Sequence, residues 1–175
     1  ILFALILLNG VFAMSEIAVV TARKTRLREW AEDGNRRAEA ALALANEPSN
    51  FLSTIQVGIT LVGIFAGAYG EATLSRGLSD FLSRFPLLDR YSEQLAFGIV
   101  VMAITYFSLI VGELVPKRLA LQNPELIASA MARPMTWLSR IAHPVVRILS
   151  GSTMLILRLL GSRPSTEPPV SEEEI

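Results

Sequence analysis

Three long apolar runs separated by polar stretches organise this chain. They cover about residues 1–22, 51–69 and 95–115. A helix rises 1.5 Å per residue, so roughly 20 residues cross the hydrocarbon core of a bilayer. Each run is long enough for one crossing. The pattern therefore predicts an all-α membrane protein with three transmembrane helices.

The polar stretches predict helices that lie at the membrane surface, over about residues 24–46 and 118–160. The first is basic and then alanine-rich, which favours a helix. The second is basic and amphipathic, and such a helix lies in the membrane interface, where we expect anionic lipids. Pro134 and Pro144 predict two or three shorter helices here rather than one.

The basic residues also predict an orientation. Residues 23–47 contain six of them, residues 70–94 three and residues 117–163 seven. Because basic loops stay in the cytoplasm, the N-terminus is expected outside and the C-terminus inside. We expect a multi-pass protein of the cell inner membrane, with a Pro-, Ser- and Glu-rich linker over residues 164–175.

Composition narrows the function classes. Hydrophobic residues make up 51% of the chain and charged residues only 18%, as in membrane proteins. Sixteen basic and sixteen acidic residues cancel, so no basic field points to nucleic acid. Cysteine is absent, which excludes disulfides and thiolate metal sites. With no HExxH motif and no aspartate pair in the spans, we do not expect an enzyme.

The end of the third run carries the main candidate chemistry, in the segment from Gly112 to Lys117. A carboxylate within a span is costly to insert, so Glu113 is a candidate functional residue. If the helix continues through Pro116, that residue has no N–H for the carbonyl of Gly112. Carboxylate and carbonyl oxygens would then lie together, as magnesium, calcium and sodium prefer. Alternatively, Glu113 pairs with Lys117 and Pro116 ends the helix.

The first two spans contain polar and glycine positions of their own. Asn9 and Glu16 share one face of the first span, with Ser15 beside them, and they either bond to a neighbouring helix or line an ion path. In the second span, Gly63 and Gly67 either allow close helix packing or let the helix break at mid-membrane. Gln56 and Thr60 lie on one side of that span, where they could line the same cavity.

Together, residues 9–16, the glycine-rich second span and residues 112–117 resemble the transmembrane module of the CNNM/CorC family of magnesium transporters. The resemblance covers roughly residues 1–160. It implies a homodimer of three-span subunits with a glycine-broken second span, a juxtamembrane helical belt and sodium-driven magnesium export. A non-transporting magnesium sensor or membrane scaffold is the alternative function.

The resemblance also implies a site for a dehydrated magnesium ion between the three spans. Ser15 and Glu113 would be side-chain ligands, and carbonyls near Gly63 and Gly67 would complete the site. Ser53, Gln56 and Thr60 would be sodium contacts. Gly112, Pro116 and Lys117 would support the site by interrupting the helix. The family carries a cytosolic CBS pair, so residues 1–163 are expected to be the transmembrane domain and 164–175 the linker toward that region, which this sequence does not include.

Overall fold

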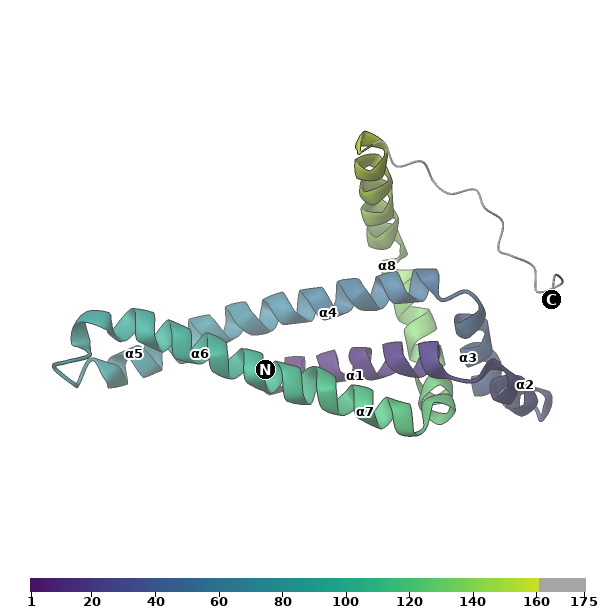
Figure 1. Ribbon diagram of the computed structural model, residues 1–175, viewed down its shortest axis with the longest axis horizontal. Helices are drawn as coiled ribbons and strands as arrows, with labels where there is room; N and C mark the ends of the chain where they lie inside the picture. The colour runs from purple at the N-terminus through teal and green to yellow at the C-terminus, as the bar shows by residue number, and fades with distance from the viewer. Residues whose placement is uncertain (161–175) are drawn as a thin grey trace.

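Three long helical segments run side by side along the long axis of the molecule, and they are the three predicted spans (Figure 1). The computed structural model describes residues 1–160, so the linker expected at 164–175 lies outside the described residues. The first span is α1 (Leu2–Thr21). The second is α4 (Ser49–Gly70), which continues through a π-helical turn η1 (Glu71–Ser75) into α5 (Arg76–Leu82). The third comprises a 3₁₀ turn η2 (Asp89–Tyr91), α6 (Ser92–Leu109), a π-helical turn η3 (Ile110–Leu114) and α7 (Val115–Gln122).

The predicted belt lies at one end of these spans. It consists of α2 (Lys24–Glu32), α3 (Arg36–Asn46) and α8 (Pro124–Leu159), and α8 runs across the direction of the spans (Figure 1). Gly34 makes the turn between α2 and α3 with φ of +86°, which a glycine adopts readily. Asn35 then caps α3 by accepting hydrogen bonds from the N–H groups of Arg37 and Ala38.

The expectation of two or three shorter helices over residues 118–160 was wrong. Helix α8 continues from Pro124 to Leu159 with both Pro134 and Pro144 inside it. Each proline removes one backbone hydrogen bond, which bends a helix without necessarily ending it. Figure 1 shows α8 changing direction near the start of α4.

The second span is also unbroken, which corrects the prediction of a glycine break. Helix α4 runs continuously from Ser49 to Gly70, through Gly63 and Gly67. The close helix contacts are made by other glycines. A Cβ on Gly58 would lie 2.8 Å from the ring of Phe12 on α1, whereas one on Gly63 or Gly67 would meet nothing within 4 Å.

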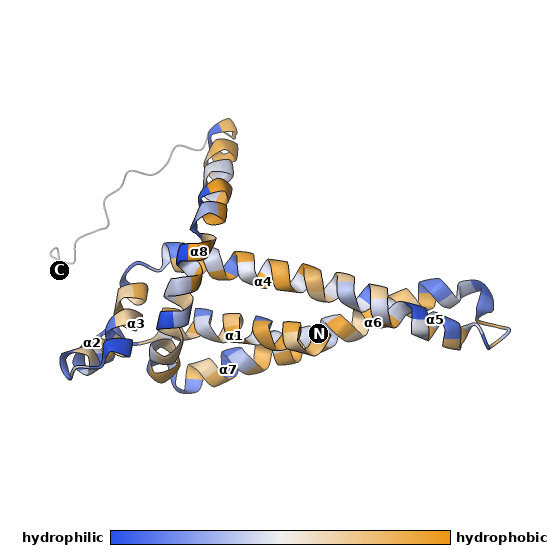
Figure 2. Ribbon diagram, turned by 180° about the vertical axis from the view of Figure 1, so that it is seen from behind, coloured by the Kyte–Doolittle hydropathy of each residue, from blue (hydrophilic) through white to orange (hydrophobic). Residues whose placement is uncertain are grey.

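The apolar core lies at the belt end, where α1, α3, α4 and α8 meet. Leu27, Phe51 and Ile55 are fully buried there. Small residues let α3 and α8 approach closely, namely Ala38, Ala41, Ala45, Ala128 and Ala132. Along the spans the outer faces are apolar and exposed, while polar residues gather at both ends (Figure 2). This distribution matches a bilayer around the spans.

Candidate metal-ion site

The first and third spans cross at a pair of glycines. A Cβ on Gly10 would lie 3.0 Å from Cγ of Pro116 and 3.1 Å from the carbonyl oxygen of Val111. A Cβ on Gly112 would lie 3.2 Å from the carbonyl oxygen of Ile6. Larger residues at either position would push the two helices apart. The absence of side chains here therefore brings the backbone of α1 against the π-helical turn η3.

Pro116 does not end the third span, because the helix continues from η3 into α7. The N–H of Val115 bonds to the carbonyl of Ile110, five residues back, and Pro116 has no N–H to give. The carbonyl of Gly112 instead accepts a hydrogen bond from Nδ2 of Asn9, at 3.1 Å. The sequence therefore pointed to the Gly112 carbonyl as an acceptor, but not to the Asn9 side chain that reaches it from α1.

The other end of the Asn9 amide is unsatisfied. Its Oδ1 is buried and has no hydrogen-bond partner within residues 1–160. An acceptor oxygen in this state favours a cation or another donor beside it. Asn9, predicted only to line a path, thus has an oxygen available at the crossing of the two helices.

Glu113 forms the ion pair considered in the simpler alternative. Its Oε1 lies 2.7 Å from Nζ of Lys117, one turn later, and the two side chains are 41% and 30% exposed. That alternative was half right, since the pair forms although the helix does not stop at Pro116. In the empty site, the ammonium of Lys117 supplies the positive charge beside the carboxylate.

The crossing places this pair near the middle of the bilayer. Gly10 is about 12 Å along the helix from the start of α1 and about 16 Å from its end. Glu113, next to Gly112, shares that depth, although it lies toward the C-terminal end of its own, longer helix. The first and third spans run in the same direction (Figure 1). Ser15 and Lys117, each five residues beyond the glycines, therefore lie at similar depth.

The remaining predicted residues occupy two other environments. Ser15 is fully buried, and its Oγ donates to the carbonyl of Val11 at 2.7 Å; Glu16 beside it is half-buried. The second-span candidates form an exposed strip on the face of α4 that is turned away from α1, consisting of Ser53, Gln56, Thr60, Gly63 and Gly67. The structure of one chain therefore joins Asn9 to Gly112 and pairs the adjacent Glu113 with Lys117, whereas Ser15 bonds within its own helix and the α4 strip lies apart.

The oxygen set limits the cation chemistry. Within residues 1–160, no three His, Cys, Asp or Glu side chains lie close enough to hold a metal ion together. A cation at the crossing would have the carboxylate of Glu113 and neutral oxygens such as Oδ1 of Asn9. Hard, oxygen-seeking ions such as magnesium accept such ligands, whereas zinc prefers imidazole and thiolate.

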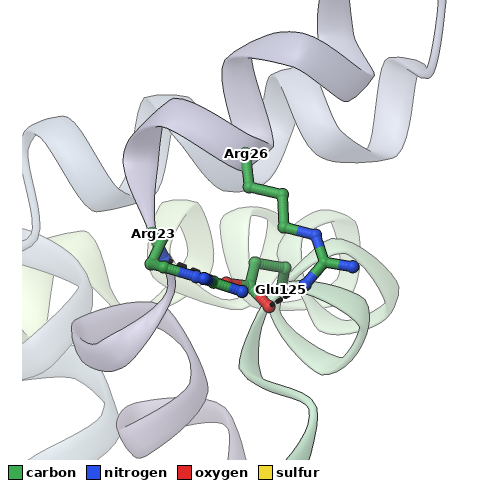
Figure 3. A network of polar contacts seen from close by, with 3 residues as sticks. All are labelled: Arg23, Arg26 and Glu125. Atoms are coloured by element: carbon green, nitrogen blue, oxygen red, sulfur yellow. Dashed lines mark hydrogen bonds and ion pairs between the residues drawn. The ribbon is translucent and has the colours of Figure 1, made fainter.

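A second charged contact joins two helices of the belt, α2 and α8, and sequence reasoning missed it (Figure 3). Glu125, in the first turn of α8, is 4% exposed and accepts from Nε of Arg23 at 2.9 Å; Arg26 lies 3.6 Å from its other oxygen. The hydrogen bond from Arg23 holds the pKa of the Glu125 carboxyl below its usual value, against the opposing effect of burial. The only signal in the sequence was an acidic residue directly after Pro124, at a helix start.

These features define a class: a helical membrane domain with three spans, an interfacial belt and an acidic residue at mid-bilayer. The profile of the cyclin M transmembrane N-terminal domain (CNNM) matches residues 1–175, and the chain belongs to that family. It is 49% identical to the UPF0053 protein sll0260 of Synechocystis over 99% of the chain and 39% of the relative. It is 30% identical to the UPF0053 protein YugS of Bacillus subtilis, over 99% of the chain and 41% of the relative.

A further relative is named for a function. The chain is 27% identical to a protein of Haemophilus influenzae named polyamine export protein, over 98% of the chain and 40% of that protein. The chain spans about two fifths of the length of these curated relatives. The family resemblance predicted from the three motifs is confirmed.

We expect Asn9→Leu to destabilise the protein by about 1–3 kcal/mol, because the Gly112 carbonyl loses its donor. In a Pro116→Ala background the new N–H can serve that carbonyl, so the same substitution should cost less. Thermal unfolding of the four proteins in detergent measures this coupling. Additive losses would show that the Asn9 bond does not compensate for the proline.

We expect Glu125→Gln to lower stability at neutral pH by about 1–2 kcal/mol, a modest cost because both arginines stay largely solvated. The pKa of Glu125 is lowered in the folded state, so its contribution is present above the ordinary glutamate pKa of about 4.3 and disappears as pH falls through the folded value. Melting temperatures of wild type and variant should therefore converge as pH falls from the ordinary glutamate pKa through the lower folded value. The exposed Glu29→Gln is the control, and a gap that stays constant with pH would contradict the assignment.

Proposed function

We propose that this domain transports magnesium ions across the cell inner membrane, as a sodium-coupled exporter. The family is a membrane transporter-type family and not an enzyme family. The observation that carries the proposal is Glu113 within the third span, directly after Gly112, whose carbonyl bonds to the Asn9 amide with its Oδ1 unsatisfied within residues 1–160. Ionisable residues at this depth generally mark ion pathways.

In this mechanism the incoming ion competes with Lys117 for the carboxylate of Glu113. The ammonium already neutralises the carboxylate, so the empty site is stable within the membrane. A magnesium ion displaces the ammonium and binds the carboxylate of Glu113. Asn9 and Ser15 lie six residues, about 9 Å, apart along α1, so Oδ1 of Asn9 and the hydroxyl of Ser15 would serve the ion at successive positions along its path. When the ion leaves, Lys117 returns to the carboxylate. An internal cation of this kind keeps binding weak enough for release.

Alternating access would involve the crossing of the first and third spans. Helix α4 is continuous, so the second span offers no hinge at Gly63 or Gly67. The π-helical turn η3 has an irregular hydrogen-bond pattern, and such turns are frequent at functional sites. Movement of α7 about η3 would expose Glu113 to one side of the membrane and then to the other.

We also propose that the exposed strip of α4 faces a second copy of the chain. Ser53, Gln56 and Thr60 are exposed along an apolar span, where contact with lipid is unfavourable. Gly63 and Gly67 in the same strip allow close helix approach. A homodimer would cover this strip and place the proposed sodium contacts at the subunit boundary.

The chain contains no cysteine, so single-cysteine variants test the dimer cleanly. We expect Gly63→Cys to form a disulfide-linked dimer on oxidation in native membranes. Phe97→Cys, on the exposed side of α6, is the control. Cross-linking at Phe97 but not at Gly63 would place the interface elsewhere and remove the support for sodium contacts there.

Two other functions compete. The polyamine export protein relative favours an organic polycation as the exported substrate, for which a single carboxylate at mid-bilayer is also a suitable partner. A magnesium sensor or membrane scaffold would bind the ion without moving it. Flux measurements with both substrates separate these functions from magnesium transport.

The test is magnesium flux into or out of proteoliposomes, with and without a sodium gradient. We expect Glu113→Gln to reduce sodium-dependent flux at least about tenfold, because the carboxylate next to Gly112 loses its charge. Lys117→Met should bind magnesium more tightly, since the competing ammonium is gone, and should release it more slowly. The exposed Glu39→Gln on α3 is the control.

Each outcome distinguishes among the functions. Flux that responds to a sodium gradient and is lost in Glu113→Gln supports the exporter. Spermidine flux without magnesium flux would favour polyamine export. Magnesium binding without flux, in a protein that also contains the regions present in its longer relatives, would favour the sensor.

A further inference from the structure

A pocket of about 570 Å³ with both polar and apolar walls lies in the belt, between the α2–α3 connection and the first turns of α8. This connection, with the helix ends beside it, contributes Trp30, Asp33, Asn35 and Arg37 to its walls. Helix α8 contributes Leu126, Ser129 and Ala130. The pocket is separate from the candidate metal-ion site, which lies at mid-bilayer among the spans.

The hydroxyl of Ser129 has no partner. The residue is only 6% exposed, and its Oγ has no hydrogen bond within residues 1–160. A buried hydroxyl without a partner costs free energy, and its presence in the wall of a pocket points to a polar ligand. The unpaired Ser129 hydroxyl is evidence separate from the charged residues on the opposite wall of the pocket.

Two side chains of opposite charge line the wall formed by α2 and α3. Arg37 lies in the first turn of α3 and Asp33 at the end of α2, and both side chains are exposed. Trp30 is half-buried, with the guanidinium of Arg26 over its ring at 5.2 Å. A ligand with both an anionic and a cationic group matches this wall better than a simple anion does.

The pocket opens onto the apolar face of α8. Leu126 and Ala130 in the pocket wall share a helix face with Trp137 and Ile141, at spacings of 4, 7 and 4 residues. Leu126, Trp137 and Ile141 are 62%, 66% and 54% exposed. An amphipathic helix buries such a face at the boundary of headgroups and acyl chains. Acyl chains along this face would bring their own headgroup to the pocket.

We infer that this pocket binds the headgroup of a zwitterionic phospholipid, of the phosphoethanolamine class. Arg37 and the Ser129 hydroxyl bind the phosphate, and Asp33 binds the ammonium. Trp30 lies at the level of the headgroup, where tryptophan is enriched in membrane proteins. Anionic lipids such as phosphatidylglycerol have no ammonium for Asp33. The inference does not depend on transport, so the metal-ion site and this site can fail separately.

The experiment measures thermal unfolding of the delipidated protein in detergent with added lipid. We expect phosphatidylethanolamine to raise the melting temperature by about 5 °C, and phosphatidylglycerol to raise it less. Asp33→Asn should remove the difference between the two lipids. Arg37→Gln should reduce the response to both, whereas its neighbour Arg36→Gln, which is outside the pocket, should leave the response unchanged.

Two further measurements test the inference, one on a Ser129→Ala variant and one with the soluble headgroup. Ser129→Ala removes the unsatisfied hydroxyl, so this variant should be at least as stable without lipid yet respond less to phosphatidylethanolamine. Soluble phosphoethanolamine tests the headgroup alone and should give little shift without acyl chains. Equal shifts with both lipids in the wild type, or equal responses of Arg37→Gln and Arg36→Gln, would overturn the inference. A full shift with soluble phosphoethanolamine would replace the lipid with a free metabolite.

Discussion

The close approach of α1 to the third span is the contact on which the proposed site depends. Gly10 and Gly112 leave too little room for side chains, so the backbones meet and Asn9 reaches the carbonyl that Pro116 leaves without a donor. A contact between glycines alone brings two helix backbones together but supplies no side-chain group that could bind an ion. Here a proline on one helix and an amide on the other turn the same contact into a polar site. Glu113 is next in the chain and therefore lies at that depth.

The sequence was most informative where a constraint acts within one element. Apolar length predicted three spans, and the structure has three helices long and apolar enough to cross a membrane. The missing N–H of Pro116 drew attention to the Gly112 carbonyl, which accepts a hydrogen bond from the side chain of Asn9. The sequence was least informative about which residues of different helices contact each other. Nothing local indicates that Asn9 meets Gly112, or that Glu125 meets Arg23, because these contacts join residues 103 and 102 positions apart.

Glycine and proline misled in the same direction, because each predicted an interruption where the helix continues. Gly63 and Gly67 predicted a break, but helices tolerate glycine when their hydrogen bonds stay intact, and α4 continues through both. Pro134 and Pro144 predicted helix ends, but α8 bends and continues. The glycines that determine packing, Gly10 and Gly112, are recognisable only once their neighbouring helix is known. Ser129 likewise became informative only as a buried atom without a partner.

The neutrality of the Glu113–Lys117 pair has an electrical consequence. At mid-bilayer the empty site carries no net charge, whereas the same site with a bound magnesium ion carries two. Moving one charge across the whole membrane potential is worth about 2.3 kcal/mol per 100 mV. Two charges carried to half depth therefore correspond to about 2.3 kcal/mol per 100 mV. In the proposed exporter, the voltage across the membrane would thus set the occupancy of the site, together with the ion concentrations on its two sides.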